Sequence, residues 1–225
     1  DIPIMKSNEI FEREGVEWTY YWWDEAGFFD RDRVACIGDS MTHHYRPEVQ
    51  KLLNDRKISV DQMAGSHCAG DPAFIAGLEY FFGMHQNYIY DVIHFNNGLH
   101  GDCNNTKIPF DIYCQGIKHA IAVIRRLQPQ AKIIIATCTH MTYGQPDNSK
   151  LDLERNAVVM KRNEFLRQFA AENGYMLDDL FPLVAGKAEY PHVDGIHFGP
   201  EGVNLLAHTV ANKILEAFGQ EPLDK

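Results

Sequence analysis

Apolar runs of strand length alternate with helical patterns along most of this chain, and this alternation constrains the fold more than any other feature. The predicted strands cover residues 34–37, 57–62, 91–95, 132–138 and 175–180, and the predicted helices cover 42–54, 71–85, 109–127, 152–173 and 200–218. Strands that alternate with helices form parallel sheets covered on both faces. We therefore predict an α/β fold, a three-layer α/β/α sandwich with a mainly parallel five-stranded sheet.

The first thirty residues do not follow the alternation. They are rich in aromatic side chains: Trp18, Tyr20, Tyr21, Trp22, Trp23, Phe28 and Phe29. We predict that residues 1–30 form an N-terminal extension packed on a single domain, residues 31–220, and we place none of the five strands in the extension. For Trp22 and Trp23 two interpretations stay open, packing on the core and stacking on sugar rings at the rim of a site.

Length and charge exclude several classes of function. A chain of 225 residues fits one domain. Its formal net charge of -10 argues against nucleic acid or an anionic membrane as the main partner. The longest apolar runs have the length of strands, so we predict no membrane span. The chain begins without a charged and then apolar leader, and Cys36 and Cys138 lie in predicted strands. These features favour the cytoplasm, with export as the alternative if a leader has been removed.

Two short motifs far apart in the sequence carry the chemistry. Ser40 ends a tight turn directly after the strand at 34–37, and we expect its neighbour Asp39 to hold that turn. Asp194 and His197 lie together on one short loop before the last helix. A serine needs a base to take its proton, and the base needs an acidic partner to fix its tautomer. We predict Ser40, Asp194 and His197 as a catalytic triad.

An acyl-transfer site also needs hydrogen-bond donors for the oxyanion. In parallel sheets such sites lie at the carboxyl ends of the strands. Gly65 follows the second predicted strand and Asn96 follows the third, so each can supply an N–H beside that of Ser40. We predict Ser40, Gly65 and Asn96 as the oxyanion hole. Asn97 is an open rival for the third position.

Four blocks in order make the chain resemble the SGNH (GDSL-type) hydrolase superfamily: Gly38-Asp39-Ser40, then Gly65, then Asn96-Asn97-Gly98-Leu99, then Asp194-Gly195-Ile196-His197. The third block departs from the usual Gly-x-Asn-Asp of the family, because His94 stands in place of its glycine. The resemblance spans residues 33–218. It implies a flavodoxin-like three-layer fold and ester hydrolysis or acyl transfer by the triad.

We therefore predict a serine esterase that hydrolyses short-chain acyl esters through an acyl-serine intermediate. Family habit and a polar, acidic chain without a long apolar lid favour O-acetyl groups on a carbohydrate, so the expected partner is a small-molecule or carbohydrate ester. The alternatives are a lysophospholipase or thioesterase, an O-acyltransferase, and a non-catalytic carbohydrate-binding module. The oligomeric state stays undecided.

We predict no cofactor and no catalytic metal. The sequence has neither His-Glu-x-x-His spacing nor a Gly-x-Gly-x-x-Gly loop after its first predicted strand. His100, Asp102 and Cys103 form a loop cluster that resembles a metal site but is explained equally well as a polar loop. His43 and His44 follow the nucleophile. Two interpretations stay open for them: they line the mouth of the pocket, or they lie exposed on the first turn of the helix.

Overall fold

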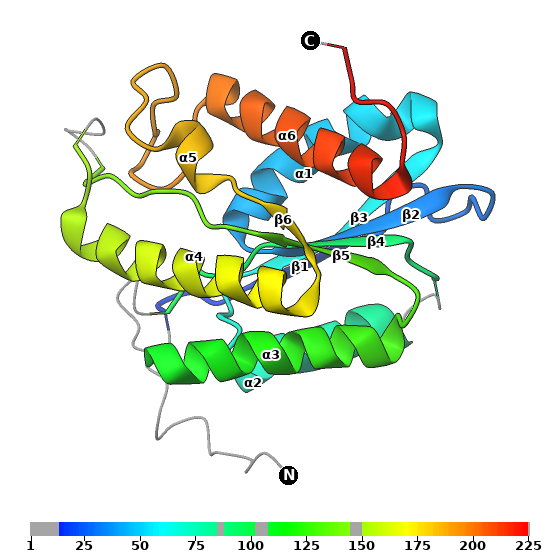
Figure 1. Ribbon diagram of the computed structural model, residues 1–225, viewed down its shortest axis with the longest axis horizontal. Helices are drawn as coiled ribbons and strands as arrows, with labels where there is room; N and C mark the ends of the chain where they lie inside the picture. Colours follow the sequence, from blue (N-terminus) through cyan, green and yellow to red (C-terminus); the bar gives the residue numbers. More distant parts are fainter. Residues whose placement is uncertain (1–13, 85–87, 102–107, 145–149, 225) are drawn as a thin grey trace.

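A six-stranded sheet forms the centre of the computed structural model (Figure 1), which describes residues 14–84, 88–101, 108–144 and 150–224. The strands are β1 (Thr19–Trp22), β2 (Asp32–Gly38), β3 (Ile58–Gly65), β4 (Val92–Phe95), β5 (Lys132–Ala136) and β6 (Met176–Asp178). Their spatial order is β1-β3-β2-β4-β5-β6. Strands β2 to β6 run parallel, and β1 pairs antiparallel with β3.

Helices cover both faces of the sheet, as predicted. They are α1 (Ser40–Leu53), α2 (Pro72–Glu79), α3 (Phe110–Leu127), α4 (Leu153–Asn173), α5 (Phe181–Val184) and α6 (Pro200–Phe218), with a 3-10 turn at Asn54–Arg56 and a π-helical turn at Tyr80–Met84. Helices α1 and α6 lie on one face, and α2 and α3 lie on the other, with α4 beside α3 (Figure 1). The three-layer α/β/α prediction is confirmed.

The predicted number of strands was wrong by one. The sixth strand is β1, which comes from the aromatic segment and pairs with β3 from Thr19 opposite Gly65 to Trp22 opposite Gln62. Its four residues are all of types that favour strands, and their side chains alternate between half-buried and exposed. A four-residue strand with no apolar-polar alternation gives little sequence signal, because its aromatic side chains are large on both faces.

The aromatic side chains of β1 and of the residue after it alternate between the buried and the exposed side of the strand. Tyr21 and Trp23 point toward the body of the domain, where Trp23 stacks on Phe81 with ring centroids 5.3 Å apart. Tyr20 and Trp22 point outward and stack on each other at 6.1 Å. Of the two interpretations of these tryptophans, packing on the core therefore applies to Trp23. Trp22 is 42% exposed and does not pack in the core.

A buried ion pair joins β2 and β3 at the end of the sheet away from their carboxyl ends. The guanidinium of Arg33 donates to both oxygens of Asp61 at 2.9 and 2.8 Å, and the Tyr90 hydroxyl donates to Asp61 at 2.8 Å. Both side chains of the ion pair are buried. Full pairing with hydrogen bonds is what permits two charges inside a core.

No helix in the described part of the chain combines the length and the apolar character that a membrane span requires. Four of the cysteines lie among the described residues and are free thiols: Cys36, Cys68, Cys114 and Cys138. Cys103 and Asp102, which we considered as part of a loop cluster, lie outside the described residues.

Candidate active site

The turn between β2 and α1 presents Ser40 at the carboxyl edge of the sheet. Asp39 caps the helix, since its Oδ1 accepts the backbone N–H of Met41 at 2.9 Å. This cap starts α1 at Ser40, two residues earlier than the sequence pattern predicts. Ser40 is therefore the first residue of the helix, where its own N–H has no acceptor within the helix.

Gly38 makes this turn sterically feasible. A Cβ atom at this position would lie 2.0 Å from the Thr42 hydroxyl oxygen and 2.4 Å from the Asn96 carbonyl oxygen. The contact with Asn96 involves its backbone, so a side-chain rotation cannot relieve it. Glycine is required because α1 begins so close to the end of β4.

Ser40, His197 and Asp194 form a continuous hydrogen-bonded chain. The Ser40 hydroxyl lies 2.7 Å from His197 Nε2, and His197 Nδ1 lies 2.6 Å from Asp194 Oδ2. A carboxylate only accepts hydrogen bonds, so Nδ1 carries the ring proton and Nε2 accepts from Ser40. The fold thus brings together three side chains separated by up to 157 residues in the geometry that activates a serine nucleophile.

The loop around Asp194 fixes the carboxylate before it contacts the imidazole. Oδ1 accepts the backbone N–H groups of Ile196 at 3.0 Å and His197 at 2.8 Å. Burial raises the pKa of Asp194, but the hydrogen bonds from the His197 side chain and from these two backbone groups outweigh it and bring the pKa to about 2. Asp194 is therefore ionised at neutral pH, as an imidazole-orienting carboxylate must be.

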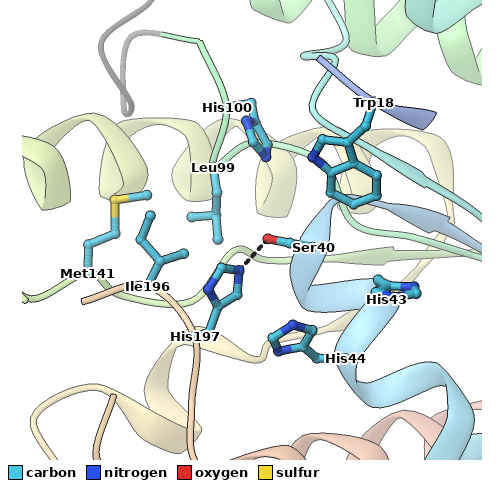
Figure 2. Close-up of a pocket in the computed structure, with 9 residues that line it drawn as sticks. All are labelled: Trp18, Ser40, His43, His44, Leu99, His100, Met141, Ile196 and His197. Carbon is cyan, nitrogen blue, oxygen red and sulfur yellow. Dashed lines mark hydrogen bonds between the residues drawn. The ribbon is translucent and has the colours of Figure 1, made fainter. Parts of the chain in front are cut away.

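A pocket of about 260 Å³ opens beside Ser40 (Figure 2). Its lining residues come from the residue before β1, from α1 and from three loops at the carboxyl edge of the sheet: Trp18, Ser40, His43, His44, Leu99, His100, Met141, Ile196 and His197. Ser40 and His197 point toward each other across it (Figure 2). The volume lies below the range of about 300–1,000 Å³ that is typical of pockets enclosing drug-sized ligands.

Three further histidines line the pocket, and burial and neighbouring charges shift their pKa values in different directions. The ring of His44 lies over that of His197, with centroids 4.5 Å apart. Burial and the charge of His197 lower the pKa of His44, and burial and Arg46 lower that of His43. His44 and His43 therefore favour the neutral form, so they add little positive charge near the nucleophile.

His100 behaves in the opposite way. Burial lowers its pKa, but a hydrogen bond to Glu14 and the charge of Asp39 outweigh burial, so the pKa is raised. His100 Nδ1 lies 2.7 Å from Glu14 Oε1. His100 is therefore a residue of the pocket wall that forms an ion pair with Glu14.

The predicted oxyanion donors occupy different surroundings. Asn97 is fully used by the fold, because its Oδ1 accepts the N–H of Ala69 at 2.9 Å and its Nδ2 donates to the carbonyl of His67 at 3.0 Å. Among the described residues, the Asn96 side chain makes two long contacts: Nδ2 donates to the Thr137 carbonyl at 3.4 Å, and Oδ1 accepts from Cys138 Sγ at 3.9 Å. Neither residue is among those that line the pocket. The bonds of Asn97 give it a bracing function, and the role of Asn96 stays a proposal.

Gly65 is the last residue of β3, and the approach of β1 explains why it is glycine. A Cβ there would lie 2.6 Å from the Trp18 carbonyl oxygen. The position therefore requires glycine whether or not its N–H contacts a substrate, and the second role also stays a proposal.

Several pocket residues were not among the sequence candidates. Trp18, Leu99, Met141 and Ile196 form the apolar wall. Leu99 and Ile196 lie inside motifs that the sequence identified, but neither was predicted as a site residue. The β1 pairing carries Trp18 into the site: its N–H donates to Ser66 Oγ at 3.0 Å, and its carbonyl accepts the Ser66 N–H at 3.0 Å. The alternating aromatic residues at 18, 20 and 22 were the available signal.

Known structures with the same arrangement identify the fold. A GDSL-like lipase from Bacteroides thetaiotaomicron superposes with a TM-score of 0.63 at 14% identity, covering 83% of this chain and 89% of that chain. A carbohydrate esterase of family 3 from Talaromyces cellulolyticus gives 0.62 at 15%, covering 84% and 98%. The chain has the SGNH hydrolase fold.

A third structure with the SGNH fold is a catalytic mutant of an acetylxylan esterase from Geobacillus stearothermophilus, with a TM-score of 0.62, 16% identity and coverage of 84% and 95%. No protein-family model matches the sequence, and no curated protein matches it. At these identities the likeness establishes the SGNH fold, and the chemistry must be argued from the residues of this chain.

Proposed function

We propose that this protein is a serine esterase of the SGNH type, a carboxylic ester hydrolase that acts through an acyl-serine intermediate. One observation carries the proposal: Ser40 Oγ lies 2.7 Å from His197 Nε2, and His197 Nδ1 lies 2.6 Å from the ionised Asp194. These contacts open onto the pocket, so the nucleophile is activated where a substrate can reach it.

In the proposed mechanism Ser40 Oγ attacks the ester carbonyl carbon while His197 Nε2 takes the serine proton. The carbonyl oxygen becomes the oxyanion, and His197 then gives its proton to the leaving alcohol. A water molecule, deprotonated by His197, attacks the acyl-serine and releases the acid. Asp194 holds the imidazole tautomer and stabilises the imidazolium in both steps.

The oxyanion needs donors that are fixed before the reaction starts. The N–H of Ser40 meets this requirement, because it opens α1 and the helix dipole makes that end electropositive. The Gly65 N–H and the Asn96 side chain complete the proposed set of donors. Asn96 supports this role better than Asn97, since its Nδ2 holds only a bond of 3.4 Å that it can exchange for a stronger one.

The size of the pocket supports a short acyl group. Its volume of about 260 Å³ must hold the acyl group and the reacting part of the alcohol. A longer acyl chain gains affinity only where its methylenes are buried, at about 0.8 kcal/mol each. We therefore expect kcat/KM to fall from acetyl to octanoyl esters.

The outer face of β1 supports a carbohydrate as the alcohol half. Trp18, directly before β1, and Tyr20 and Trp22 within it alternate along the chain, so they point to the same side. His43 links them to the pocket, because its ring lies 6.2 Å from that of Trp18 and 4.9 Å from that of Tyr20. Tyr20 and Trp22 are 40% and 42% exposed and stacked on each other. We call Trp18, Tyr20 and Trp22 the aromatic row. Exposed aromatic faces suit the apolar faces of sugar rings.

Two of the known structures with this fold are, by their descriptions, an acetylxylan esterase and a carbohydrate esterase. This supports an O-acetylated carbohydrate as the substrate class but does not select a particular sugar. The aromatic row runs from the pocket along an open edge of the sheet, which fits an oligosaccharide better than a single small ester.

The first test is Ser40→Ala. The variant should stay folded, lose hydrolysis of p-nitrophenyl acetate and lose labelling by a serine-directed fluorophosphonate. An active or still labelled variant would overturn the mechanism, and a folded wild type that takes no label would point to a binding module.

The second test separates the substrate class from the chemistry. Trp22→Ala should raise KM for an acetylated xylo-oligosaccharide by about tenfold, the loss expected for one aromatic contact, and leave p-nitrophenyl acetate hydrolysis unchanged. Phe29→Ala, which removes another exposed aromatic ring, is the matched control. An unchanged KM in Trp22→Ala would remove the aromatic row from the site, and a rise in kcat/KM with acyl-chain length would favour a lysophospholipase or thioesterase.

A further inference from the structure

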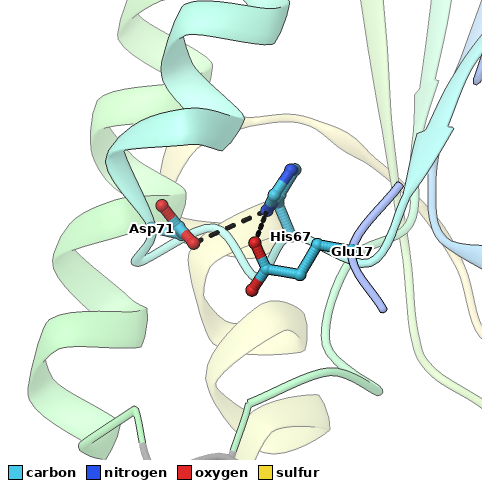
Figure 3. Close-up of side chains that lie close together, drawn as sticks. All are labelled: Glu17, His67 and Asp71. Carbon is cyan, nitrogen blue, oxygen red and sulfur yellow. Dashed lines mark ion pairs between the residues drawn. The ribbon is translucent and has the colours of Figure 1, made fainter. Parts of the chain in front are cut away.

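Three side chains that the proposed esterase reaction does not use converge beside the aromatic row. Glu17 precedes Trp18, His67 lies in the loop after β3, and Asp71 caps the N-terminus of α2. Figure 3 shows one ring nitrogen of His67 facing both carboxylates, with an ion pair drawn to each. His67 Nδ1 lies 3.9 Å from Glu17 Oε2 and 3.5 Å from Asp71 Oδ2, and the three ligand atoms lie within 4.8 Å of one another.

The separation of 3.5 Å between His67 and Asp71 matches that of two ligands on one ion, and the separation of 3.9 Å between His67 and Glu17 exceeds it by a few tenths of an ångström, which a rotation of the Glu17 side chain removes. Zn²⁺ binds nitrogen and oxygen at about 2.0–2.2 Å in a tetrahedron, which puts neighbouring ligand atoms about 3.3–3.6 Å apart. His67 Nδ1 is also buried, and among the described residues it has no hydrogen-bond partner. This ring nitrogen forms ion pairs with the two carboxylates when it carries a proton, and it has the position of a metal ligand when a metal ion takes the place of that proton.

The fold holds the three ligands in place independently of any ion. The His67 carbonyl accepts from Asn97 Nδ2 at 3.0 Å, and the Ala69 N–H donates to Asn97 Oδ1 at 2.9 Å, so Asn97 braces the loop. Asp71 Oδ1 accepts the N–H of Ala73 at 2.8 Å, which leaves Oδ2 facing His67. Glu17 adjoins the Trp18–Ser66 backbone pairing that attaches β1 to β3.

We propose that Glu17, His67 and Asp71 bind a divalent metal ion of the Zn²⁺ class. Imidazole with carboxylates suits Zn²⁺ better than Ca²⁺, which prefers oxygen ligands only. A divalent ion matches the charge of a site that has two carboxylate ligands. Three protein ligands leave a fourth position for water.

The position of the site implies a structural effect near the pocket. The ion joins the segment before β1 to the loop after β3 and to α2, and the residue next to Glu17 is Trp18 of the pocket wall. Binding therefore stabilises the edge of the sheet on which the aromatic row lies. Ester hydrolysis at Ser40 does not pass through the ion, so the proposal stands apart from the proposed function.

The experiment titrates chelator-treated protein with Zn²⁺ and measures stoichiometry by calorimetry and Tm by calorimetric scanning. Wild-type protein should bind one equivalent at this site, and at a hundredfold excess over Kd its Tm should rise by about 5–10 °C. Ca²⁺ should give a smaller shift. Absence of Zn²⁺ binding, or binding without a rise in Tm, would overturn the proposal.

Ligand variants locate the ion. Glu17→Gln and Asp71→Asn, which keeps an N-cap oxygen, should each weaken Zn²⁺ binding at least tenfold. The matched control Glu189→Gln removes an exposed carboxylate from the loop between α5 and α6 and should bind as the wild type does. His197→Ala should also retain the site. Binding that survives in Glu17→Gln but is lost in His197→Ala would place the ion at the pocket and overturn the assignment.

Discussion

Replacing Asp194 with asparagine tests the proposed triad most sharply, because both carboxylate oxygens accept hydrogen bonds. Oδ1 accepts two backbone N–H groups, from Ile196 and His197, and Oδ2 accepts the ring proton of His197 at 2.6 Å. A carboxamide has only one acceptor oxygen. If that oxygen faces the backbone, the NH₂ group faces Nδ1 and favours the tautomer with the proton on Nε2, which cannot accept from Ser40.

The flipped carboxamide fails for another reason. Its oxygen would then accept the Nδ1 proton, but its NH₂ group would point at two backbone N–H donors. Both backbone bonds would be lost, at a net cost of about 1 kcal/mol each. The tautomer that leaves Ser40 without a base is therefore the better accommodated one.

The expected loss follows from known triads and from the exposure of this one. A wrong tautomer lowers kcat by about 10⁴-fold in the serine proteases. The Asp194 side chain is 51% exposed, so water can replace part of its function. We expect kcat for p-nitrophenyl acetate to fall about 10³–10⁴-fold, which corresponds to about 4–5.5 kcal/mol in the barrier.

The assay compares kcat, the rate of fluorophosphonate labelling and the urea unfolding midpoint in the wild type, Asp194→Asn and Asp194→Ala. The alanine variant should keep more activity than the asparagine variant, because it does not hold the ring in the wrong tautomer. Asp55→Asn, in the exposed turn after α1, is the matched control. A folded Asp194→Asn protein with kcat within tenfold of the wild type would refute this reasoning.

Three further predictions concern the strand ends and the core. Asn96→Ala should lower kcat about 10²–10³-fold, as expected for one lost oxyanion donor, with little change in stability. Asn97→Ala should instead lower the free energy of unfolding, because it removes the bonds to Ala69 and His67; the opposite pattern in kinetics and urea titrations would exchange the two roles. Burial and the charge of His192 lower the pKa of His140 to about 4, so the unfolded state binds this proton first as pH falls from about 6.5. The free energy of unfolding should therefore decrease between pH 7 and 4, and His140→Gln should reduce that slope in urea titrations at several pH values; an equal slope in both proteins would show that other groups cause it. Asp61→Asn leaves the buried Arg33 charge uncompensated and should cost about 3–5 kcal/mol in urea unfolding, whereas a loss below 1 kcal/mol would mean that water reaches the pair.

Local sequence patterns determined the α/β/α layers of this protein and the residues of its two catalytic motifs. The run of isoleucines in β5 and the apolar residues of β2 predict buried parallel strands. A strand that is covered on both faces is apolar at every position, so a short stretch of sequence is enough to recognise it. The Asp194 loop is equally local, because the carboxylate is held by the backbone of its own next three residues. Asp39 likewise acts within one turn, since it accepts the N–H of Met41.

Tertiary structure decided everything that depends on pairing between distant segments. No local pattern states that β1 will add to the edge of β3, because pairing of an edge strand depends on the partner and its register. That pairing adds the sixth strand, brings Trp18 into the pocket and sets Glu17 opposite His67. The bracing role of Asn97 is also tertiary. Successive residues at a strand end point to opposite faces, and only the packing of the neighbouring loops determines that Asn97 meets the backbone of His67 and Ala69.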